Sequence, residues 1–283
     1  MLYGLATFPT TYSMSPAELA QAAEDREFES LWVAEHSHIP ACRSTPWPGG
    51  SELPQMYYDV YDPFVALTAA AAATSKIKLA TGISLVVQRH PITLAKQVAT
   101  LDCISNGRFL FGVGGGWNVE EIENHGTPFK RRFKLMRERV EAMKALWTLP
   151  TAEYHGEFVD FDPVHLNPKP LQKPHPPIHV GGEAPWAIGR AVAYGDGWMP
   201  LAGRTAGRDI CDEIPEFLHA AKEAGRDPDS LEVSLYACPP DRQALERYRE
   251  AGLSRAIFFV PSANAEVVLP LLDNYAGLAS QVG

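Results

Sequence analysis

The stretch that decides the fold is Arg108-Phe109-Leu110-Phe111-Gly112-Val113-Gly114-Gly115-Gly116-Trp117-Asn118-Val119-Glu120-Glu121. It begins as a short apolar run, which is the pattern of a strand buried on both faces. Four glycines in five positions follow, and Asn118 is then a good N-cap with two glutamates in the first turn after it. The stretch predicts a parallel strand that turns directly into a helix.

Glycines at such a junction have two interpretations. They let backbone N–H groups face an anion and let a ligand approach closely, or they serve only a tight turn. The spacing excludes two familiar nucleotide sites. Trp117 stands where the dinucleotide fingerprint needs its third glycine, and no Gly-Lys-Ser/Thr follows for a P-loop.

The same alternation of short apolar strands and helices fills the rest of the chain. Ser15-Pro16 and Asp62-Pro63 each place an N-cap before a proline, which marks a helix start. Eight βα units predict an α/β fold, a (β/α)8 TIM barrel. We expect one barrel domain over residues 1–283, with loop insertions at the C-terminal face. The predicted strands are 2–8, 30–34, 76–83, 108–113, 178–182, 197–200, 231–237 and 256–260.

Two segments interrupt this alternation. Residues 39–61 are rich in proline and aromatic side chains, including Trp47, Tyr57 and Tyr58, and favour an ordered lid or pocket wall. Residues around 150–177 predict an insertion, formed by a hairpin over 154–161 and a proline-rich connector. Pro215 predicts a kink or a split in the helix over 209–224.

Composition narrows the classes of function. A chain of 283 residues that is 46% hydrophobic can bury a large core, and its net charge of −9 argues against binding to nucleic acid or anionic membranes. No secretory signal or apolar run of membrane length is visible. Four scattered cysteines fit a reducing compartment. We expect a cytoplasmic protein that binds neither nucleic acid nor membrane.

The barrel prediction locates the site, because chemistry in this fold sits at the C-terminal ends of the strands. There the chain places a glycine turn after the fourth strand and another, Gly181-Gly182, after the fifth. The two turns predict a phosphate clamp. The side chains expected to form the substrate pocket around them are Phe8, His38, Trp47, Tyr57 and Trp198.

The second strand ends in Glu35-His36-Ser37-His38. A histidine two residues from another is how some barrel hydrolases hold a metal, but further ligands would be needed, and Asp196 is the best remaining carboxylate. A single catalytic histidine acting as acid or base is the favoured interpretation for His36. A structural role stays open for both histidines, more so for His38, and we expect no bound metal.

Several motifs in order resemble the bacterial luciferase-like flavin and deazaflavin oxidoreductases. The similarity covers the chain to about residue 201. Within the family, the motifs most resemble the subgroup that uses coenzyme F420. The motifs are Leu31-Trp32-Val33-Ala34-Glu35-His36, Ala80-Thr81-Gly82-Ile83, Arg89-His90-Pro91, Ala95-Lys96-Gln97, Gly107-Arg108, Gly112 to Trp117, Pro168-Lys169-Pro170, Pro176 to Gly182 and Gly195-Asp196-Gly197-Trp198.

The resemblance implies a tricyclic ring over the barrel mouth, propped by a bulge with a non-prolyl cis peptide. The matching bond here is Gly82–Ile83 or its neighbour in register. His36 matches the acid/base of the family, and Glu35 stands where relatives often have an aspartate near the ring. The residues implied to contact the cofactor are Thr81, Gly82, Ile83, Gly114, Gly115, Gly116, Trp117, Gly181, Gly182 and Glu183.

The leading hypothesis is therefore hydride transfer between coenzyme F420 and a small organic substrate, with Glu35 and His36 as catalytic residues. One alternative is an FMN-dependent monooxygenase that works with a flavin reductase. A second, from another class, is a metal-dependent barrel hydrolase built on His36 and His38. A third is a cofactor-binding protein without turnover. Relatives are often dimers, so a homodimer is expected.

Overall fold

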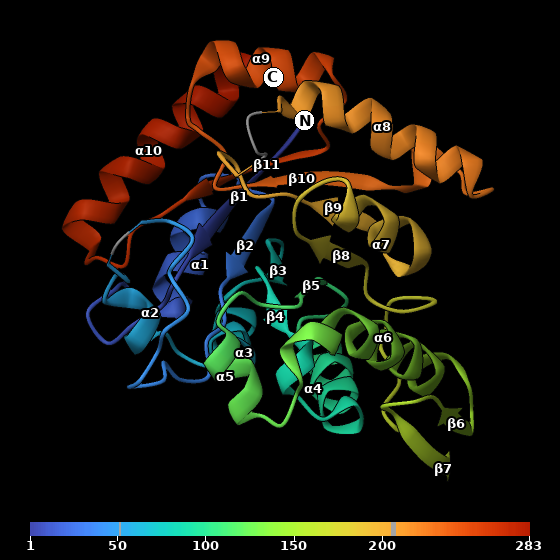
Figure 1. Cartoon of the computed structure of the whole chain (residues 1–283). Coiled ribbons are helices and arrows are strands. Elements are labelled where there is room, and N and C mark those ends of the chain that lie inside the picture. The colour runs from blue at the N-terminus through green and yellow to red at the C-terminus, as the bar shows by residue number, and fades with distance from the viewer. Residues whose placement is uncertain (51, 205–207) are drawn as a thin grey trace.

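The computed structural model describes residues 1–50, 52–204 and 208–283. Within these residues, eight parallel strands form a closed barrel surrounded by helices, as the sequence predicts (Figure 1). The barrel closes because β1 pairs with β11 and β3 pairs with β5. In order around the barrel, the strands are β1 (Leu2–Thr7), β2 (Ser30–Val33), β3 (Lys78–Thr81), β5 (Phe109–Gly114), β8 (Ile178–Gly181), β9 (Gly197–Met199), β10 (Glu232–Tyr236) and β11 (Arg255–Phe259).

The third predicted strand differs from the observed one. Instead of running over 76–83, β3 ends at Thr81, and the chain resumes as β4 (Ser84–Leu85) and the 3-10 turn η1 (Val86–Gln88). β4 pairs with the end of β5, where Leu85 lies opposite Gly114. The peptide between the two strands, Gly82–Ile83, is cis, the register that the resemblance implies. The interruption forms a bulge at the barrel mouth.

Helices cover the outside of the barrel, and their predicted start signals are confirmed. Ser15 forms a capping box with Glu18, and the Asp62 carboxylate accepts hydrogen bonds from the backbone of Phe64 and Val65. Pro215 lies inside α8, which is one continuous helix, so the predicted split is wrong. The outer helices are α1 (Pro16–Glu24), α3 (Pro63–Ala73), α4 (Pro91–Ile104), α6 (Arg132–Thr148), α7 (Trp186–Tyr194), α8 (Ile210–Glu223), α9 (Arg242–Glu250) and α10 (Ala265–Val282).

Shorter elements lie in the loops. At the C-terminal face, α2 (Met56–Asp59) belongs to the long loop after β2, and α5 (Val119–Asn124) follows the glycine run. The turns η2 (Phe129–Arg131) and η3 (Pro228–Ser230) precede α6 and β10. The predicted insertion contains an antiparallel hairpin, β6 (Ala152–His155) and β7 (Asp160–Val164), which lies beyond α6 and outside the barrel (Figure 1). No helix in the described ranges has the length and apolar character that a membrane crossing requires.

The interior of the barrel is filled with side chains. A small cluster inside the ring of strands consists of Ala6, Trp32, Ala80, Leu110, Met199 and Ile257, with Ile83 and Tyr236 packed above it. At the opposite end Arg255 is fully buried and donates to both Glu29 oxygens at 2.7 and 2.9 Å. It also donates to Glu232 at 2.7 Å. These carboxylates hold the pKa of Arg255 above its usual value although burial alone would lower it.

This ion cluster generates a stability prediction. Replacing Arg255 by Ala leaves two carboxylates facing each other without their shared cation, so Arg255→Ala should lower the free energy of unfolding by about 3–5 kcal/mol in urea titrations. The matched control is Arg242→Ala, which removes an exposed i,i+4 pair with Glu246 and should cost under about 1 kcal/mol. Equal losses in the two variants would contradict this account.

Candidate active site

A cavity of about 770 Å³ lies at the C-terminal ends of the barrel strands. The barrel prediction locates it correctly, because parallel strands of a barrel all end at one face. Most of the predicted site residues line it: Phe8, Glu35, His36, Tyr57, Gly82, Ile83, Gly114, Gly115, Gly116, Trp117, Gly181, Gly182 and Glu183.

Four predicted residues do not line the cavity. Trp198 points outward from β9, packs on Phe217 at 5.8 Å between ring centroids, and donates its indole N–H to the Gly182 carbonyl at 2.8 Å. Its neighbour Met199 lines the cavity instead, since successive side chains of a strand face opposite sides. Thr81 is buried in the barrel and donates to the Gly112 carbonyl at 2.7 Å. Both residues support the wall from behind.

His38 and Trp47 also lie behind the cavity wall. The His38 imidazole contacts the Ser37 hydroxyl at 2.9 Å and the Asn124 side chain at 3.0 Å, on the outer side of the loop. Trp47 packs edge-on against Tyr57 at 5.7 Å, so it backs the residue that lines the cavity. Tyr58 is more than half exposed and takes no part in the wall. Of the described residues in the predicted loop, Met56 and Tyr57 line the cavity, so this part of the loop forms a wall.

The bulge explains several of the glycines. The Ile83 side chain lies on the two glycine strands: a Cβ at Gly114 would be 1.8 Å from Ile83 Cδ1, and a Cβ at Gly181 would be 2.9 Å from Ile83 Cγ2. At Gly112, a Cβ would lie 2.0 Å from the Thr81 carbonyl oxygen. These three glycines are required by the bulge. The need for glycine at Gly114 and Gly181 is thus explained without an anion, and their predicted contact with the cofactor tail stays a prediction.

Two arginines lie near the residues that follow Gly114 and Gly181: a Cβ at Gly182 would be 3.3 Å from Arg190 Nη2, and a Cβ at Gly115 would be 3.5 Å from Arg132 Cγ. Gly116 and Gly182 have φ of +69° and +127°, conformations that favour glycine. Phe133, which would collide with a Cβ at Gly115, is sandwiched between the guanidiniums of Arg132 and Arg190 at 4.1 and 4.0 Å from its ring centroid. Sequence reasoning missed Arg190 entirely.

Neither guanidinium is fully used by the protein. The Nε of Arg132 and the Nε of Arg190 are buried without a hydrogen-bond partner among the described residues. Burial lowers the pKa of both side chains, and in Arg132 the proximity of Arg190 lowers the pKa further. The two guanidiniums, which both contact Phe133, therefore repel each other in a partly buried position.

His36 is held by a carboxylate that sequence reasoning did not single out. Its Nδ1 lies 2.8 Å from Glu121 Oε2, and the two side chains are 7% and 1% exposed. The other oxygen of Glu121 accepts from the Ser37 backbone N–H at 3.2 Å. An ionised carboxylate only accepts, so Nδ1 carries the hydrogen and Nε2 is left for a ligand. Tyr57 and Trp117 flank the imidazole at 5.1 and 5.9 Å.

The adjacent glutamate of α5 fastens the loop after β2. Glu120 accepts from the Ser44 backbone and hydroxyl at 2.8 and 2.5 Å, and from the Thr45 hydroxyl at 2.6 Å. These hydroxyl donors lower the pKa of Glu120 to about 2. In the sequence, Glu120 and Glu121 indicate only a helix N-terminus, but in the structure they have different partners. Glu121 holds the histidine, and Glu120 holds the loop after β2 at Ser44 and Thr45.

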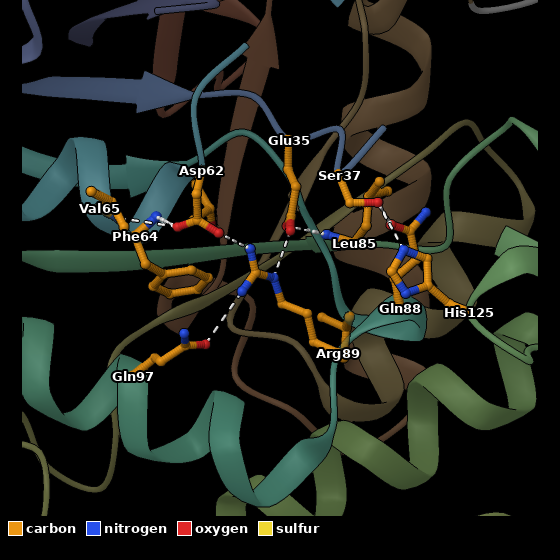
Figure 2. A network of polar contacts seen from close by, with 12 residues as sticks. Glu35, Ser37, Asp62, Phe64, Val65, Leu85, Gln88, Arg89, Gln97 and His125 are labelled. Carbon is orange, nitrogen blue, oxygen red and sulfur yellow. Dashed lines mark hydrogen bonds and ion pairs between the residues drawn. The ribbon is translucent and has the colours of Figure 1, made fainter. Parts of the chain in front are cut away.

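Glu35 connects the end of β2 to the segment after the bulge. Its carboxylate accepts from the Leu85 backbone at 2.7 Å and from Arg89 Nε at 2.5 Å, as Figure 2 shows. Arg89 Nη2 also donates to Oδ2 of Asp62, the N-cap of α3, at 2.5 Å. Burial raises the pKa of Glu35, and the Arg89 guanidinium opposes that rise. The network fastens the end of β2, which carries His36, to the segment after the bulge.

Comparison with known proteins identifies the family. A profile described as luciferase-like monooxygenase matches residues 12–268. The chain belongs to the luciferase-like monooxygenase family.

Proteins with similar sequences include an uncharacterised protein, an F420-dependent dehydrogenase and an FMNH2-dependent monooxygenase. An uncharacterised protein of Mycobacterium tuberculosis is 42% identical over 283 residues, with 98% of both chains covered. An F420-dependent hydroxymycolic acid dehydrogenase of the same species is 30% identical, covering 81% of this chain and 60% of its own. An FMNH2-dependent dimethylsulfone monooxygenase of Pseudomonas putida is 38% identical, covering 41% of this chain and 32% of its own.

Two solved structures share the fold. Monooxygenase RslO1 from Streptomyces bottropensis superimposes with a TM-score of 0.80 at 23% identity, with 99% of each chain covered. An F420-dependent secondary alcohol dehydrogenase bound to an F420-acetone adduct gives a TM-score of 0.77 at 22% identity, with 100% of each chain covered. At these identities the likeness establishes the TIM-barrel fold of the family.

One further titratable group lies in the cavity of this luciferase-like protein. Glu183 follows the second glycine turn, and its Oε2 is buried without a hydrogen-bond partner among the described residues. Burial raises the pKa of Glu183 from 4.5 to about 7, although Arg204 opposes the rise. The carboxyl is therefore partly protonated near neutral pH.

This shift generates a pH prediction. A carboxyl whose pKa is raised in the folded state binds its proton more tightly there, so folded stability falls as pH rises from about 4.5 to 7. Glu183→Gln removes this contribution. Its melting temperature relative to wild type should rise between pH 4.5 and 8, in scans at constant ionic strength. Glu123→Gln, an exposed change on α5, is the control, and a pH-independent difference for Glu183→Gln would contradict the assignment.

Proposed function

We propose that this protein is an oxidoreductase that transfers a hydride between coenzyme F420 and a small organic substrate. The observation that carries the proposal is that His36, the bulge at Ile83 and Arg190 line one cavity. Glu121 holds His36 from behind, and Arg132 packs on Phe133, a further lining residue. The family membership and the F420-dependent relative that covers most of the chain support the choice of cofactor.

The residues present fit a tricyclic cofactor with an anionic tail. The Ile83 bulge forms an apolar support at the barrel mouth. The Nε–H groups of Arg132 and Arg190 have no partner among the described residues and could donate to a phosphate or carboxylate. The backbone of Gly115, Gly116 and Gly182 would lie beside the tail. When bound, a deazaflavin supplies the hydride acceptor or donor.

The chain supplies proton transfer and orientation. His36 presents Nε2 to the cavity, where it would accept a proton from a substrate hydroxyl or return one to a carbonyl oxygen. Glu121 holds Nδ1–H and stabilises the imidazolium that forms, as the carboxylate of a catalytic triad does. Tyr57 and Trp117 flank the histidine and restrict water around it.

The alternatives receive unequal support. An FMN-dependent monooxygenase that works with a flavin reductase would use the same cavity, and an FMNH2-dependent relative makes it the second candidate. The metal-dependent hydrolase has no ligand set, because no three His, Cys, Asp or Glu side chains of the described residues are grouped to hold a metal. We also propose that the enzyme is one barrel domain, acts in the cytoplasm and forms a homodimer.

Cofactor titration tests the proposal directly. Oxidised F420 added to the purified protein should show quenched fluorescence with saturation, whereas FMN should bind at least about tenfold more weakly. Because Arg190 would hold the anionic tail, Arg190→Gln should weaken F420 binding by about tenfold, the loss of one charge-assisted hydrogen bond. Arg242→Gln, on the far surface of α9, is the control. Tight FMN binding without an F420 response would overturn the choice of cofactor.

The role of His36 is tested separately. His36→Ala should suppress turnover by at least about 100-fold, the contribution typical of a general acid or base, and leave F420 affinity nearly unchanged. His38→Ala is the matched control, since its imidazole lies behind the wall and turnover should persist. Unchanged turnover in His36→Ala would rule out the assignment.

A further inference from the structure

One arginine of the cavity has no acidic partner in direct contact. Arg204 lines the cavity, and within the described residues its side chain forms no ion pair. Arg190, the other arginine in the lining, stacks on Phe133 at 4.0 Å from the ring centroid. Arg204 therefore presents to the cavity a positive charge that no neighbouring carboxylate neutralises by contact.

The turn that carries Arg204 is fixed to the barrel through its backbone. Leu201 forms a parallel bridge with Tyr236 of β10, and the Ala202 N–H donates to the Tyr236 carbonyl at 2.9 Å. The Arg204 N–H then donates to the Leu201 carbonyl at 3.3 Å. The Tyr236 hydroxyl is buried without a partner among the described residues, so the backbone of Tyr236, and not its phenol, holds the turn.

Arg204 acts on groups from two sides of the cavity. Burial raises the pKa of Tyr57, in the loop after β2, and the Arg204 guanidinium opposes that rise. The same guanidinium opposes the rise of the Glu183 pKa, at the turn after β8. Tyr57 packs against His36 at 5.1 Å between ring centroids. An anion bound by Arg204 would therefore lie on the side of the cavity where Tyr57 meets His36.

The surroundings of this charge are mostly apolar. Tyr57 packs on Phe8 at 4.7 Å between ring centroids. The other apolar side chains that line the cavity with them are Met56, Leu201 and Phe259. A ligand that fills this part would combine a body of carbon with one acidic group.

We propose that Arg204 forms a second anion-binding site of the cavity and binds a carboxylate or phosphate group of a predominantly apolar substrate. A guanidinium suits either group, because its planar fork of donors matches two oxygens at once. The site differs from the one assigned to the cofactor tail, since Arg190 lies beside Gly182 and Phe133. Calling the anion a substrate rests on the hydride-transfer function, whereas binding of an anion by Arg204 does not.

Glu183 makes this site sensitive to pH. Burial raises the pKa of Glu183 to about 7, Arg204 opposes the rise, the Leu201 backbone donates a hydrogen bond, and Glu213 adds to the rise. Glu213 of α8 lies 3.8 Å from Arg208. Above about pH 7 the ionised Glu183 competes for Arg204 and repels a ligand anion. Affinity for the anion should therefore fall as the pH rises through this range.

A carboxylate and its uncharged amide test the site without turnover. Cyclohexanecarboxylate and cyclohexanecarboxamide share a ring and differ in charge, and each is titrated into the protein at pH 6 with ligand-observed NMR. The carboxylate should bind at least about tenfold more tightly, the gain expected from one charge-assisted contact. Absence of carboxylate binding, or equal binding of the amide, would overturn the proposal.

Two arginine variants locate the anion. Arg204→Gln should weaken carboxylate binding by about tenfold and leave amide binding unchanged, because only the charged contact is lost. Arg190→Gln, which removes the other arginine of the lining, is the matched control and should leave the carboxylate preference intact. The reverse result would place the anion on Arg190 and contradict the assignment.

A third variant tests the part assigned to Glu183. In the wild type, carboxylate affinity should fall at least about threefold between pH 6 and pH 8, the effect of one nearby like charge, and in Glu183→Gln it should stay constant. Glu123→Gln, on the exposed side of α5, should retain the wild-type dependence. Persistence of the dependence in Glu183→Gln would assign it to another group of the cavity, such as His36, and remove Glu183 from the site.

Bound F420 separates this inference from the proposed function. In protein saturated with F420, the carboxylate should still bind, and competition between the two would assign Arg204 to the cofactor tail and overturn the substrate site. Failure of F420 to bind, together with the expected effect of Arg204→Gln, would remove the hydride-transfer proposal and leave the anion site supported.

Discussion

The side chain of Ile83 lies directly on Gly114 and Gly181, and the geometry of the barrel mouth depends on this contact. A Cβ at either glycine would enter the space that Ile83 occupies. The contact requires residues without a side chain on both strands. The glycine run therefore serves first to make room for the Ile83 side chain. The bulge in turn forms the floor on which a planar ring would rest. The anion site that we propose for the cofactor tail lies beyond this contact, where Gly182 has the Arg190 guanidinium beside it.

Two carboxylates, those of Glu35 and Glu121, connect the bulge region to the segment that carries His36. Glu35 connects the end of β2 to Leu85, just beyond the bulge, and through Arg89 to the start of α3 (Figure 2). Glu121 reaches back from the helix after the glycine run to hold His36. The histidine is therefore positioned by the segment after the bulge and by α5. These two attachments fix the position of the imidazole relative to the bulge, which the proposed hydride transfer would need.

Local patterns in the sequence predict the fold and most of the site. Alternating apolar strands and capped helices indicate the barrel, and the barrel places Phe8, His36 and the glycine turns at one face. Partners far apart in the chain are not predicted. Glu121 lies 85 residues from His36, and nothing in its helix distinguishes it from Glu120. The sequence predicts Trp198 in the pocket, but its side chain faces outward, because a three-residue strand has too few positions to show which side chains face inward. The orphan hydroxyl of Tyr236 is a property of packing across the barrel, which sequence patterning does not reveal.

The most direct measurement of the central claim is a double-mutant cycle on Ile83 and Gly114, followed by urea unfolding. If Ile83 occupies the space above Gly114, Gly114→Ala should cost about 1–3 kcal/mol in the wild-type background and little in an Ile83→Ala background, where the collision is gone. Gly189→Ala, at a helical position with nothing within 4 Å of the added Cβ, should be neutral or stabilising. Equal costs of Gly114→Ala in both backgrounds, additive within about 0.5 kcal/mol, would contradict the account.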